Sequence, residues 1–390
     1  MRRSPRATLT VRALAIAVLV LTACVRPPQP IADVSPTPEP GYLDVTALLD
    51  LSGDRAPRGD AQRNALALWN DLAQTRGRGP VRIRVNVVDV GGSDARMLIE
   101  LRRAAVEGRA DAVIVGAPVS FGTPAFSDAV QAAELPILMT MPLDEPATER
   151  GGRWVFAIAP TPEQIAKRVV VITPSPLDTL VITAEGRPAD SEVGAILREW
   201  RRTARTYPQE LRVDRRDEVI QAAVRLASPG RRVHLAGPPR YWSTLGAALK
   251  QGGRGATYVL SYLTDHSDLG EFRDGLDAVW PAPLHLTLAA IPPNSTASAR
   301  RQFVQSYADR HGPPTAHAVA AYDALSALAL AAERSGADDR ERLREQLELT
   351  TFAGIATTYA FSVSRHAGHS GEDLALYRWS GSAPVLDTRR

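Results

Sequence analysis

Two short stretches combine hydroxyl, glycine and charged residues in a pattern suited to holding a small polar molecule. The stretch "LSGDRAPRG" follows the first predicted strand, and "GAPVSFGTP" follows the third. Open α/β sheets bind ligands at the carboxyl ends of their strands, beside helix N-termini whose N–H groups are free to donate. The candidate binding residues are Ser52, Asp54 and Arg55 in the first stretch, and Ser120, Phe121, Gly122 and Thr123 in the second. Two ordinary turns with helix caps are the alternative interpretation.

Other reactive constellations are weaker. His366 and His369 form "RHAGH", with no thiolate nearby and carboxylates only at Glu372 and Asp373, so the pair does not predict a metal site. The sequence also has no phosphate-loop lysine motif, no dinucleotide-binding glycine spacing and no nucleophile elbow. We therefore expect no metal, no cofactor and no enzymatic activity.

The only cysteine, Cys24, stands at the end of an apolar run. Arginines without any acidic residue precede "ALAIAVLVL", which is too short to span a bilayer as a stable helix. The next residues, "LTAC", resemble the bacterial lipobox, in which small residues precede a cysteine that becomes the lipidated N-terminus. We predict a signal peptide over residues 1–23 and lipid on Cys24. An ordinary secretory peptide with an incidental cysteine is the alternative.

The residues after Cys24 and the overall charge point to a tethered body without nucleic-acid chemistry. Residues 24–41 contain closely spaced prolines, which exclude helix and sheet and predict a semi-rigid polyproline tether. The formal net charge of the chain is +3, and residues 1–23 carry four arginines and no acids, so the remainder lies near −1. The basic character of the precursor is therefore no evidence for a nucleic-acid partner.

From residue 42 onward, short apolar runs alternate with amphipathic helical patterns. "YLDVTALLD", "VRIRVNVVD", "DAVIVG" and "LPILMT" predict strands, a helix is expected over Pro124–Ala133, and Ser93 is expected to cap another helix. A second set of strands and helices begins at "TLVITA". This order predicts parallel sheets covered on both faces, and the length exceeds one usual domain. We expect an α/β protein of two doubly wound, three-layer (αβα) lobes.

Several strings, in their order along the chain, resemble the type I periplasmic binding proteins of the branched-chain amino-acid group. The strings are "LSGDRAPRGDAQRNALALWN", "VVDVGGSDARMLIELRRAAVEGRADAVIVGAPVS", "AVQAAELPILMT", "FVQSYADRHGPPTAHAVAAYDALSALALA" and "FAGIATTYAFSVSRHAG". The resemblance implies two lobes joined by a hinge of three strands, with crossovers near residues 142–158, 286–294 and 350–358. It places the N-terminal lobe at 42–150 and 290–350, and the C-terminal lobe at 151–289 and 351–390.

The same resemblance assigns roles to the candidate loops and shows where this chain departs from the group. Ser120 lies at or next to the position that holds a ligand carboxylate, and Thr140 in "MTMPLDEP" lies where the group supplies hydroxyl contacts. The acidic residue that grips a ligand ammonium is expected after "ATYVLSY", where this chain has Tyr262 and Leu263. Asp265 lies two residues beyond. We therefore expect a ligand other than a standard α-amino acid, or one held differently.

These observations predict a lipid-anchored extracytoplasmic solute-binding protein. It would capture a small polar molecule in a cleft between the lobes and deliver it to an ABC importer. The expected partners are this ligand, the membrane through the lipid anchor, and an ABC permease, with no nucleic acid. The expected location is the extracytoplasmic face of the cell membrane. A surface lipoprotein of the same fold that senses a ligand or regulates a partner, without a role in transport, is the alternative.

Overall fold

The structure is a computed structural model of the whole chain, and its helices and strands lie between residues 41 and 388. It describes residues 41–75, 81–107, 110–118, 124–143, 152–172, 175–184, 187–213, 217–237, 242–252, 255–264, 269, 272–273, 275–293, 298–336 and 339–388. The predicted signal peptide, Cys24 and almost all of the predicted tether fall outside these residues. No described helix combines the length and the apolar composition that crossing a bilayer requires.

A five-stranded parallel sheet forms the first lobe, with strand order β2-β1-β3-β4-β5. Its strands are β1 (Gly41–Leu49), β2 (Val81–Asp89), β3 (Ala112–Val115), β4 (Ile137–Met139) and β5 (Val155–Ala157). The strands β3, β4 and β5 are buried along their whole length, as expected for a parallel sheet with helices on both faces. Val45 of β1 pairs with Val85 of β2 on one side and with Ala112 of β3 on the other.

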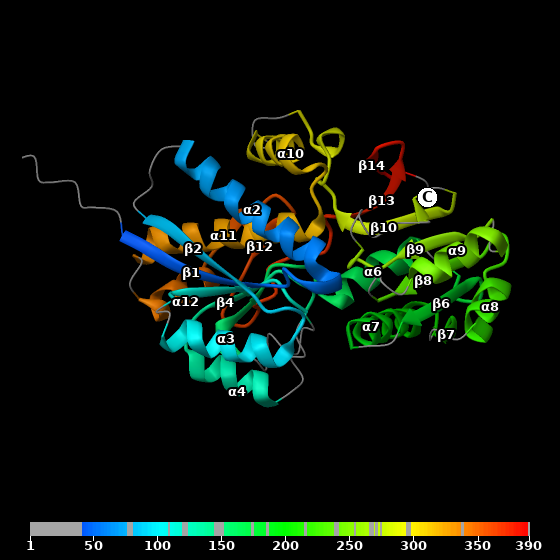
Figure 1. Cartoon of the computed structure of the whole chain (residues 1–390), viewed down its shortest axis with the longest axis horizontal. Helices are drawn as coiled ribbons and strands as arrows, with labels where there is room; N and C mark the ends of the chain where they lie inside the picture. Colours follow the sequence, from blue (N-terminus) through cyan, green and yellow to red (C-terminus); the bar gives the residue numbers. More distant parts are fainter. Residues whose placement is uncertain are drawn as a thin grey trace, which may run out of the picture. The chain divides into compact units, whose positions relative to one another are not determined.

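Helices cover both faces of this first sheet (Figure 1). One face carries α2 (Ala56–Thr75) and α11 (Ala316–Ser335), which share an apolar cluster with Leu43, Val45 and Ala47 of β1. The other face carries α3 (Asp94–Val106) and α4 (Pro124–Ala133), which form a separate cluster with Val113 and Val115 of β3. The remaining elements of this lobe are η1 (Gly53–Arg55), η2 (Gly152–Trp154), α10 (Ser298–His311) and α12 (Arg340–Glu348).

The helix signals in the first lobe agree with the sequence. The helix α4 spans the predicted residues, and the Ser93 side chain accepts a hydrogen bond from the Arg96 N–H at 3.2 Å as the cap of α3. Thr315 caps α11 in the same way through the Ala318 N–H. Such caps satisfy N–H groups that lack a partner in the first turn of a helix, and they fix where the helix begins.

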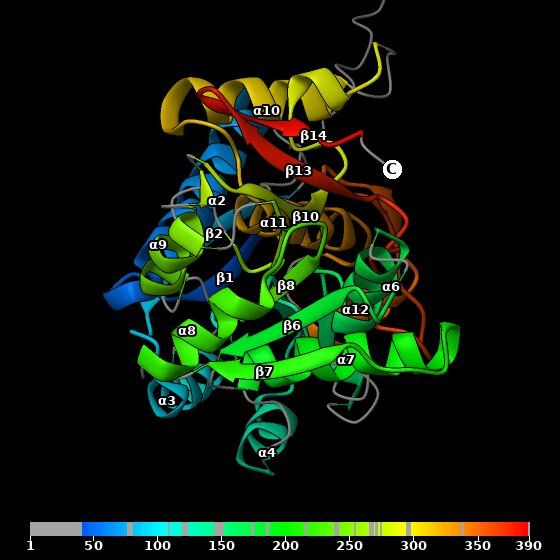
Figure 2. The same ribbon diagram turned by 90° about the vertical axis from the view of Figure 1, so that its right-hand side faces the viewer.

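A seven-stranded mixed sheet forms the second lobe, with strand order β14-β13-β10-β9-β8-β6-β7. The parallel strands are β6 (Thr179–Ala184), β7 (Gln209–Val213), β8 (Arg232–Ala236), β9 (Thr257–Leu260) and β10 (Asp277–Pro283). The strands β13 (Leu374–Ser380) and β14 (Ala383–Leu386) join them in antiparallel fashion. The helices α6 (Pro162–Ile172) and α7 (Arg187–Thr203) cover one face, and α8 (Asp217–Leu226) and α9 (Trp242–Gly252) cover the other (Figure 2).

The chain passes between the two sheets at three places. It passes first between β5 and α6, then through η6 (Leu288–Ala290) between β10 and α10, and finally from β11 (Thr351–Ala353) and β12 (Thr358–Ala360) to β13. The sequence places the first lobe boundary at residue 150, whereas β5 pairs with β4 and extends the first sheet to Ala157. The strand β5 falls inside the crossover that the resemblance places near residues 142–158, so the resemblance does not show which lobe it joins.

Candidate functional site

The carboxyl end of β1 is held against the loop that follows β2 by one buried carboxylate. Asp50 is 2% exposed, and its Oδ1 accepts a hydrogen bond from the Gly92 N–H at 2.7 Å. Its Oδ2 forms an ion pair with the Arg55 guanidinium at 3.3 Å. The guanidinium also lies beside Gly92, where an added Cβ would come within 3.7 Å of Nη1. Arg55, a predicted binding residue, is therefore placed over the neighbouring loop.

A second carboxylate, Asp89 at the end of β2, binds the β1 loop in return. Its Oδ1 accepts the N–H groups of Leu51 and Gly91, both at 2.9 Å. Burial opposes the charged form, but these two bonds, the Ser52 hydroxyl and the nearby Arg96 charge together lower the pKa of Asp89. Gly91 adopts a φ of 58°, which strains any L side chain, and an added Cβ would lie 3.1 Å from the Ser52 Oγ, which would have to shift.

Ser52 and Asp54 stay exposed on this framework. Close packing below them begins at Gly59, where an added Cβ would lie only 1.9 Å from the Asp50 carbonyl oxygen. Only glycine therefore allows the first turn of α2 to pack against the end of β1. The predicted residues Ser52, Asp54 and Arg55 thus lie together at the carboxyl end of β1.

Thr140 occupies a different environment at the end of β4. Its side chain is fully buried, with its Oγ1 3.2 Å from the Val115 carbonyl oxygen and 3.5 Å from the Gln62 Oε1. Gln62 comes from α2, and its Nε2 donates to the Gly116 carbonyl at 3.1 Å. The hydroxyl of Thr140 therefore holds the ends of β3 and β4 together, and its contact with a ligand stays a prediction.

The second predicted loop joins β3 to α4, but its candidate residues Ser120, Phe121, Gly122 and Thr123 lie outside the described residues. The described chain reaches position 118 and resumes at Pro124, the first residue of α4. Their roles therefore stay predictions.

In the second lobe, one glutamate joins the loops that follow β8 and β9. Glu192 on α7 is 6% exposed, and its Oε2 accepts from the Ser261 hydroxyl at 2.6 Å and from the Gly237 N–H at 3.2 Å. Its Oε1 lies 3.1 Å from Nε2 of His234 on β8. Ser261 in turn accepts the Leu263 N–H at 3.1 Å. The carboxyl ends of two central strands are thus fixed by a single side chain.

Sequence reasoning missed Glu192, although one signal for it exists. The buried positions of α7 include Ile196 and Trp200, and Glu192 lies four residues before Ile196 on the same helical stripe. A glutamate on an apolar stripe must find hydrogen-bond donors when the helix packs, because an unpaired buried carboxylate is costly. The donors themselves are distant in sequence.

Comparisons with known proteins agree with this architecture. A family model described as periplasmic binding protein matches residues 233–383. A structure titled periplasmic binding protein type 1 from Bordetella pertussis Tohama I is similar with a TM-score of 0.72 at 15% identity, over 89% of this chain and 99% of that chain. The chain has the type I periplasmic binding protein fold. The fold that the resemblance implies is thereby confirmed.

Two further solved structures show the same fold. An extracellular ligand-binding receptor from Rhodopseudomonas palustris HaA2 has a TM-score of 0.75 at 16% identity, over 89% of this chain and 100% of that chain. An ABC transporter substrate-binding protein from Desulfitobacterium hafniense, in complex with Leu, has a TM-score of 0.68 at 17% identity, over 89% of this chain and 100% of that chain. No curated protein sequence matches the chain significantly.

Within this type I fold, the segment after β9 buries an aromatic side chain. Tyr262 and Leu263 are 2% and 6% exposed, and Tyr262 shares an apolar cluster with Ala316 at the start of α11. Its ring meets that of His317 edge to face, with centroids 6.5 Å apart. Burial raises the pKa of the Tyr262 hydroxyl well above its usual value. Position 262 is thus filled by a neutral group that packs against the first lobe.

The two histidines of "RHAGH" lie beside the crossovers with separate partners. His366 stacks on Phe156, and its Nδ1 and Nε2 lie 3.1 Å from the Val155 carbonyl and the Glu348 carboxylate, respectively. The Nδ1 of His369 accepts the Gly371 N–H at 2.9 Å, and burial lowers its pKa to about 4. Among the described residues, no group of three His, Cys, Asp or Glu side chains is arranged to hold a metal ion.

Proposed function

We propose that this chain is a lipid-anchored, extracytoplasmic solute-binding protein that captures a small polar molecule between its lobes and delivers it to an ABC importer. The observation that carries the proposal is the rigid framework at the carboxyl end of β1, where Asp50 and Asp89 hold Ser52 and Arg55 beside Gly91 and Gly92. Parallel α/β sheets bind ligands at this edge. The type I fold supports the same assignment.

The mechanism that we propose is hinge closure without covalent chemistry. A ligand that touches both lobes binds the closed state more tightly than the open state, so it shifts the population toward closure. A permease would then recognise the closed form. The carboxyl-end loops of both lobes are fixed by buried carboxylates, so closure would bring together two rigid surfaces.

We propose that no residue of the segment after β9 holds an ammonium group of the ligand. Tyr262 and Leu263, where the resemblance places the acidic partner, are buried and uncharged. Asp265, two residues beyond Leu263, lies outside the described residues. Loss of a buried charge partner costs about 3–5 kcal/mol, which moves a micromolar binder beyond ordinary detection. Free leucine, isoleucine and valine are therefore expected to bind poorly.

A thermal-shift screen tests the proposed function. Amino acids, short peptides, amides, sugars and aromatic acids are added to the folded body, and a ligand that binds the native state raises its melting midpoint. A hit whose affinity falls when Ser52 or Ser120 is replaced by alanine, with an unchanged midpoint of the free protein, supports the assignment. The absence of a hit in every class would contradict the proposed function. Micromolar binding of leucine, measured by calorimetry, would contradict the proposed specificity.

A separate experiment tests the anchor. Mass spectrometry of the membrane fraction is expected to find lipid on Cys24, and Cys24→Ser is expected to release the protein from the membrane. A mature chain with an unmodified Cys24 would contradict the anchor without affecting the binding function.

The second candidate function is a surface sensor or regulator, and the packing of Tyr262 against α11 is the observation that favours it. A permease encoded next to the gene, and transport lost on deletion of the gene, would support the transporter. Capture of a membrane signalling protein in a ligand-dependent manner would support the sensor.

A further inference from the structure

The five parallel strands of the second sheet begin along one edge, which we call the basic edge. Contacts across it show that its segments are neighbours. The Arg232 N–H donates to the Asp178 carbonyl at 3.0 Å, and the Gly230 N–H donates to the Gly255 carbonyl at 2.8 Å. The basic side chains on the basic edge and at the helix ends leading into it are Arg201, Arg202, Arg205, Arg225, Arg231, Arg232, Lys250 and Arg273.

Few carboxylates balance these cations. Asp178, Glu199 and Asp277 lie on the same edge, and Glu199 is paired with Arg202 at 2.5 Å. Within the described parts of the chain, no ion pair is recorded for Arg201, Arg205 or Arg225, and all three are exposed. The body as a whole is close to neutral, so this edge is a local excess of positive charge and not a reflection of net charge.

Helix dipoles explain part of this pattern but not all of it. Arg201, Arg225 and Lys250 lie in the last turns of α7, α8 and α9, where a cation stabilises the helix. The dipole does not explain two large apolar side chains at the same edge. Leu177 is 76% exposed and Tyr207 is 51% exposed.

Leu177 and Tyr207 precede two neighbouring strands on the basic edge. Each lies two residues before a strand, β6 and β7 respectively, and these strands pair in parallel with Leu180 opposite Gln209. The Arg231 guanidinium reaches the Gln209 side chain at 3.0 Å, so a cation lies beside the pair. The edge therefore presents two protruding apolar side chains surrounded by arginines.

The corresponding edge of the first lobe also exposes apolar side chains, Tyr42 and Val106, but its charges are more evenly balanced. Three of its arginines are paired: Arg84 with Asp44 at 2.6 Å, Arg103 with Glu107 at 3.1 Å and Arg153 with Glu341 at 3.2 Å. Asp111, Glu134 and Asp339 add further negative charge around a cavity of about 600 Å³ there. The positive excess is thus particular to the second lobe.

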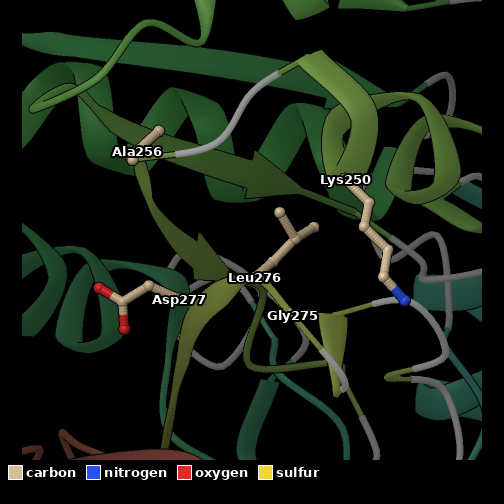
Figure 3. Close-up of a pocket in the computed structure, with 6 residues that line it drawn as sticks. Lys250, Ala256, Gly275, Leu276 and Asp277 are labelled. Carbon is tan, nitrogen blue, oxygen red and sulfur yellow. The ribbon is translucent and has the colours of Figure 1, made fainter.

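A pocket of about 510 Å³ opens on the basic edge between Lys250 and the starts of β9 and β10. Figure 3 shows Lys250 and Asp277 pointing to opposite sides of Leu276, so the amine lies away from that carboxylate. Gly255 and Gly275 line the pocket without side chains.

We propose that the basic edge docks on the surface of a membrane that contains anionic phospholipid. Arginine and lysine near such a surface are attracted to the headgroups, and their apolar stems tolerate the interface. Leu177 and Tyr207 enter the headgroup region, where a single aliphatic or aromatic side chain gains from burial. Two isolated side chains fit a fluid lipid surface, whereas a specific protein partner requires a continuous complementary patch. The inference is independent of lipid on Cys24 and of the captured ligand.

Vesicle sedimentation tests this inference directly. The protein is the chain from residue 25 onward, which omits the apolar segment 13–21 and keeps every described helix, strand and apolar cluster. It is mixed with vesicles of phosphatidylcholine alone, or of equal parts phosphatidylcholine and phosphatidylglycerol. Binding is expected only to the second kind, and it is expected to weaken at least about tenfold when salt rises from about 50 to about 300 mM.

Paired variants identify the surface. Arg201→Glu with Arg205→Glu is expected to weaken binding at least about tenfold. Arg102→Glu with Arg334→Glu, at exposed positions of the first lobe, makes the same charge change and is expected to preserve binding. Leu177→Ser with Tyr207→Ser is expected to weaken binding without changing its salt dependence. Circular dichroism confirms that each variant is folded.

Three results would overturn the inference. The first is that the protein does not sediment with anionic vesicles. The second is that both charge-reversal variants lose vesicle affinity equally. The third is that the protein binds an immobilised acidic polypeptide more tightly than vesicles, with an affinity that Leu177→Ser and Tyr207→Ser do not change. The last result would assign the basic edge to an acidic protein partner.

Discussion

Glu192 in the second lobe and Asp323 on α11, beside the third crossover, are buried carboxylates that each accept two or three hydrogen bonds, but they connect different segments. Glu192 accepts hydrogen bonds from Gly237 and Ser261. These two donors belong to the segments that follow two neighbouring strands, and His234 of β8 lies beside them. Asp323 on α11 accepts the N–H groups of Ile355 and Ala356 at 2.7 and 2.9 Å and the Tyr359 hydroxyl at 3.1 Å, all from the hairpin of β11 and β12. Glu192 therefore fixes two loops to each other, whereas Asp323 fixes one turn to one helix.

The electrostatic surroundings of Asp323 explain a further property of that site. It is fully buried, and burial raises its pKa to about 6, although its three hydrogen bonds and the charge of Arg300 act in the opposite direction. The Arg300 Nε is engaged by the Gly354 carbonyl at 2.8 Å, so the guanidinium is not bonded directly to the carboxylate. At Glu192, by contrast, an imidazole lies within hydrogen-bonding distance of the carboxylate.

This difference shows how buried carboxylates position the loops of the second lobe and the turn of the third crossover. A buried ionisable group contributes little net stability compared with a well-packed apolar group, because its desolvation is costly. Its main contribution is to hold its partners in place, because moving them away would leave a buried charge without hydrogen bonds, at a large cost in free energy. The comparison predicts that removal of the carboxylate is most damaging where its partners come from several segments.

Glu192→Ala is expected to have the largest effect. It leaves the Ser261 hydroxyl, the Gly237 N–H and the His234 ring without their acceptor in a buried space, which should lower the free energy of unfolding by about 3–5 kcal/mol. Urea unfolding followed by circular dichroism measures this change. Glu218→Ala on the exposed side of α8 is the matched control, with an expected change within about 0.5 kcal/mol. Equal effects of the two variants would show that Glu192 does not fix the loops.

Asp323→Asn is expected to change how stability depends on pH. Between the unfolded pKa near 3.8 and the folded value of about 6, the native state holds a proton that the unfolded state has lost, so stability falls as pH rises through this window. The gap of about two units corresponds to about 3 kcal/mol. The stability difference between wild type and Asp323→Asn should therefore shrink by about that amount from pH 4 to 7. A constant difference, like that of exposed Asp309→Asn, would contradict the raised pKa.

The contrast between these two regions also shows what the sequence could and could not predict. The rhythm of strands and helices was readable, because period-2 and period-3.6 patterns reflect burial on one side of an element. The cap at Ser93 and the span of α4 were predicted correctly for the same local reason. The loops after β1 and β3 were recognised as candidates because they combine hydroxyl, glycine and charged residues at predicted strand ends.

The roles of Glu192 and Asp323 could not be predicted, because they depend on residues that meet only after folding. Glu192 is separated from His234 by 42 residues and from Ser261 by 69. Asp323 meets its turn across 32 to 36 residues. A single sequence contains no signal for such pairs beyond a charged residue on an apolar stripe. The strand β5 was missed for another reason, since it lies within the predicted crossover near residues 142–158.

Ser261→Ala is expected to cost less than Glu192→Ala and to sharpen the account of the second lobe. The Ser261 hydroxyl donates to Glu192 and also accepts the Leu263 N–H, so its loss removes one charged hydrogen bond and leaves one buried N–H unpaired. The expected destabilisation is about 2 kcal/mol, measured by urea unfolding. Adding Ser261→Ala to Glu192→Ala should lower the free energy of unfolding by at most about another 0.5 kcal/mol, because the two residues act as one unit. Additive losses would mean that they act separately.

Tyr359→Phe is expected to have the smallest effect, and its pH dependence separates two roles of the hydroxyl. The hydroxyl donates to Asp323 at 3.1 Å and lowers the pKa of that carboxyl, so its removal should raise the pKa further. Above the folded pKa the carboxylate is charged and loses a donor, which should cost about 1–2 kcal/mol; near pH 4 it is neutral, and the cost should be smaller. Unfolding by urea near pH 4 and near pH 7 measures both values. Tyr207→Phe, at an exposed position, is the control and should change neither. An equal loss at both pH values would show that the hydroxyl acts only through packing and not on the charge of Asp323.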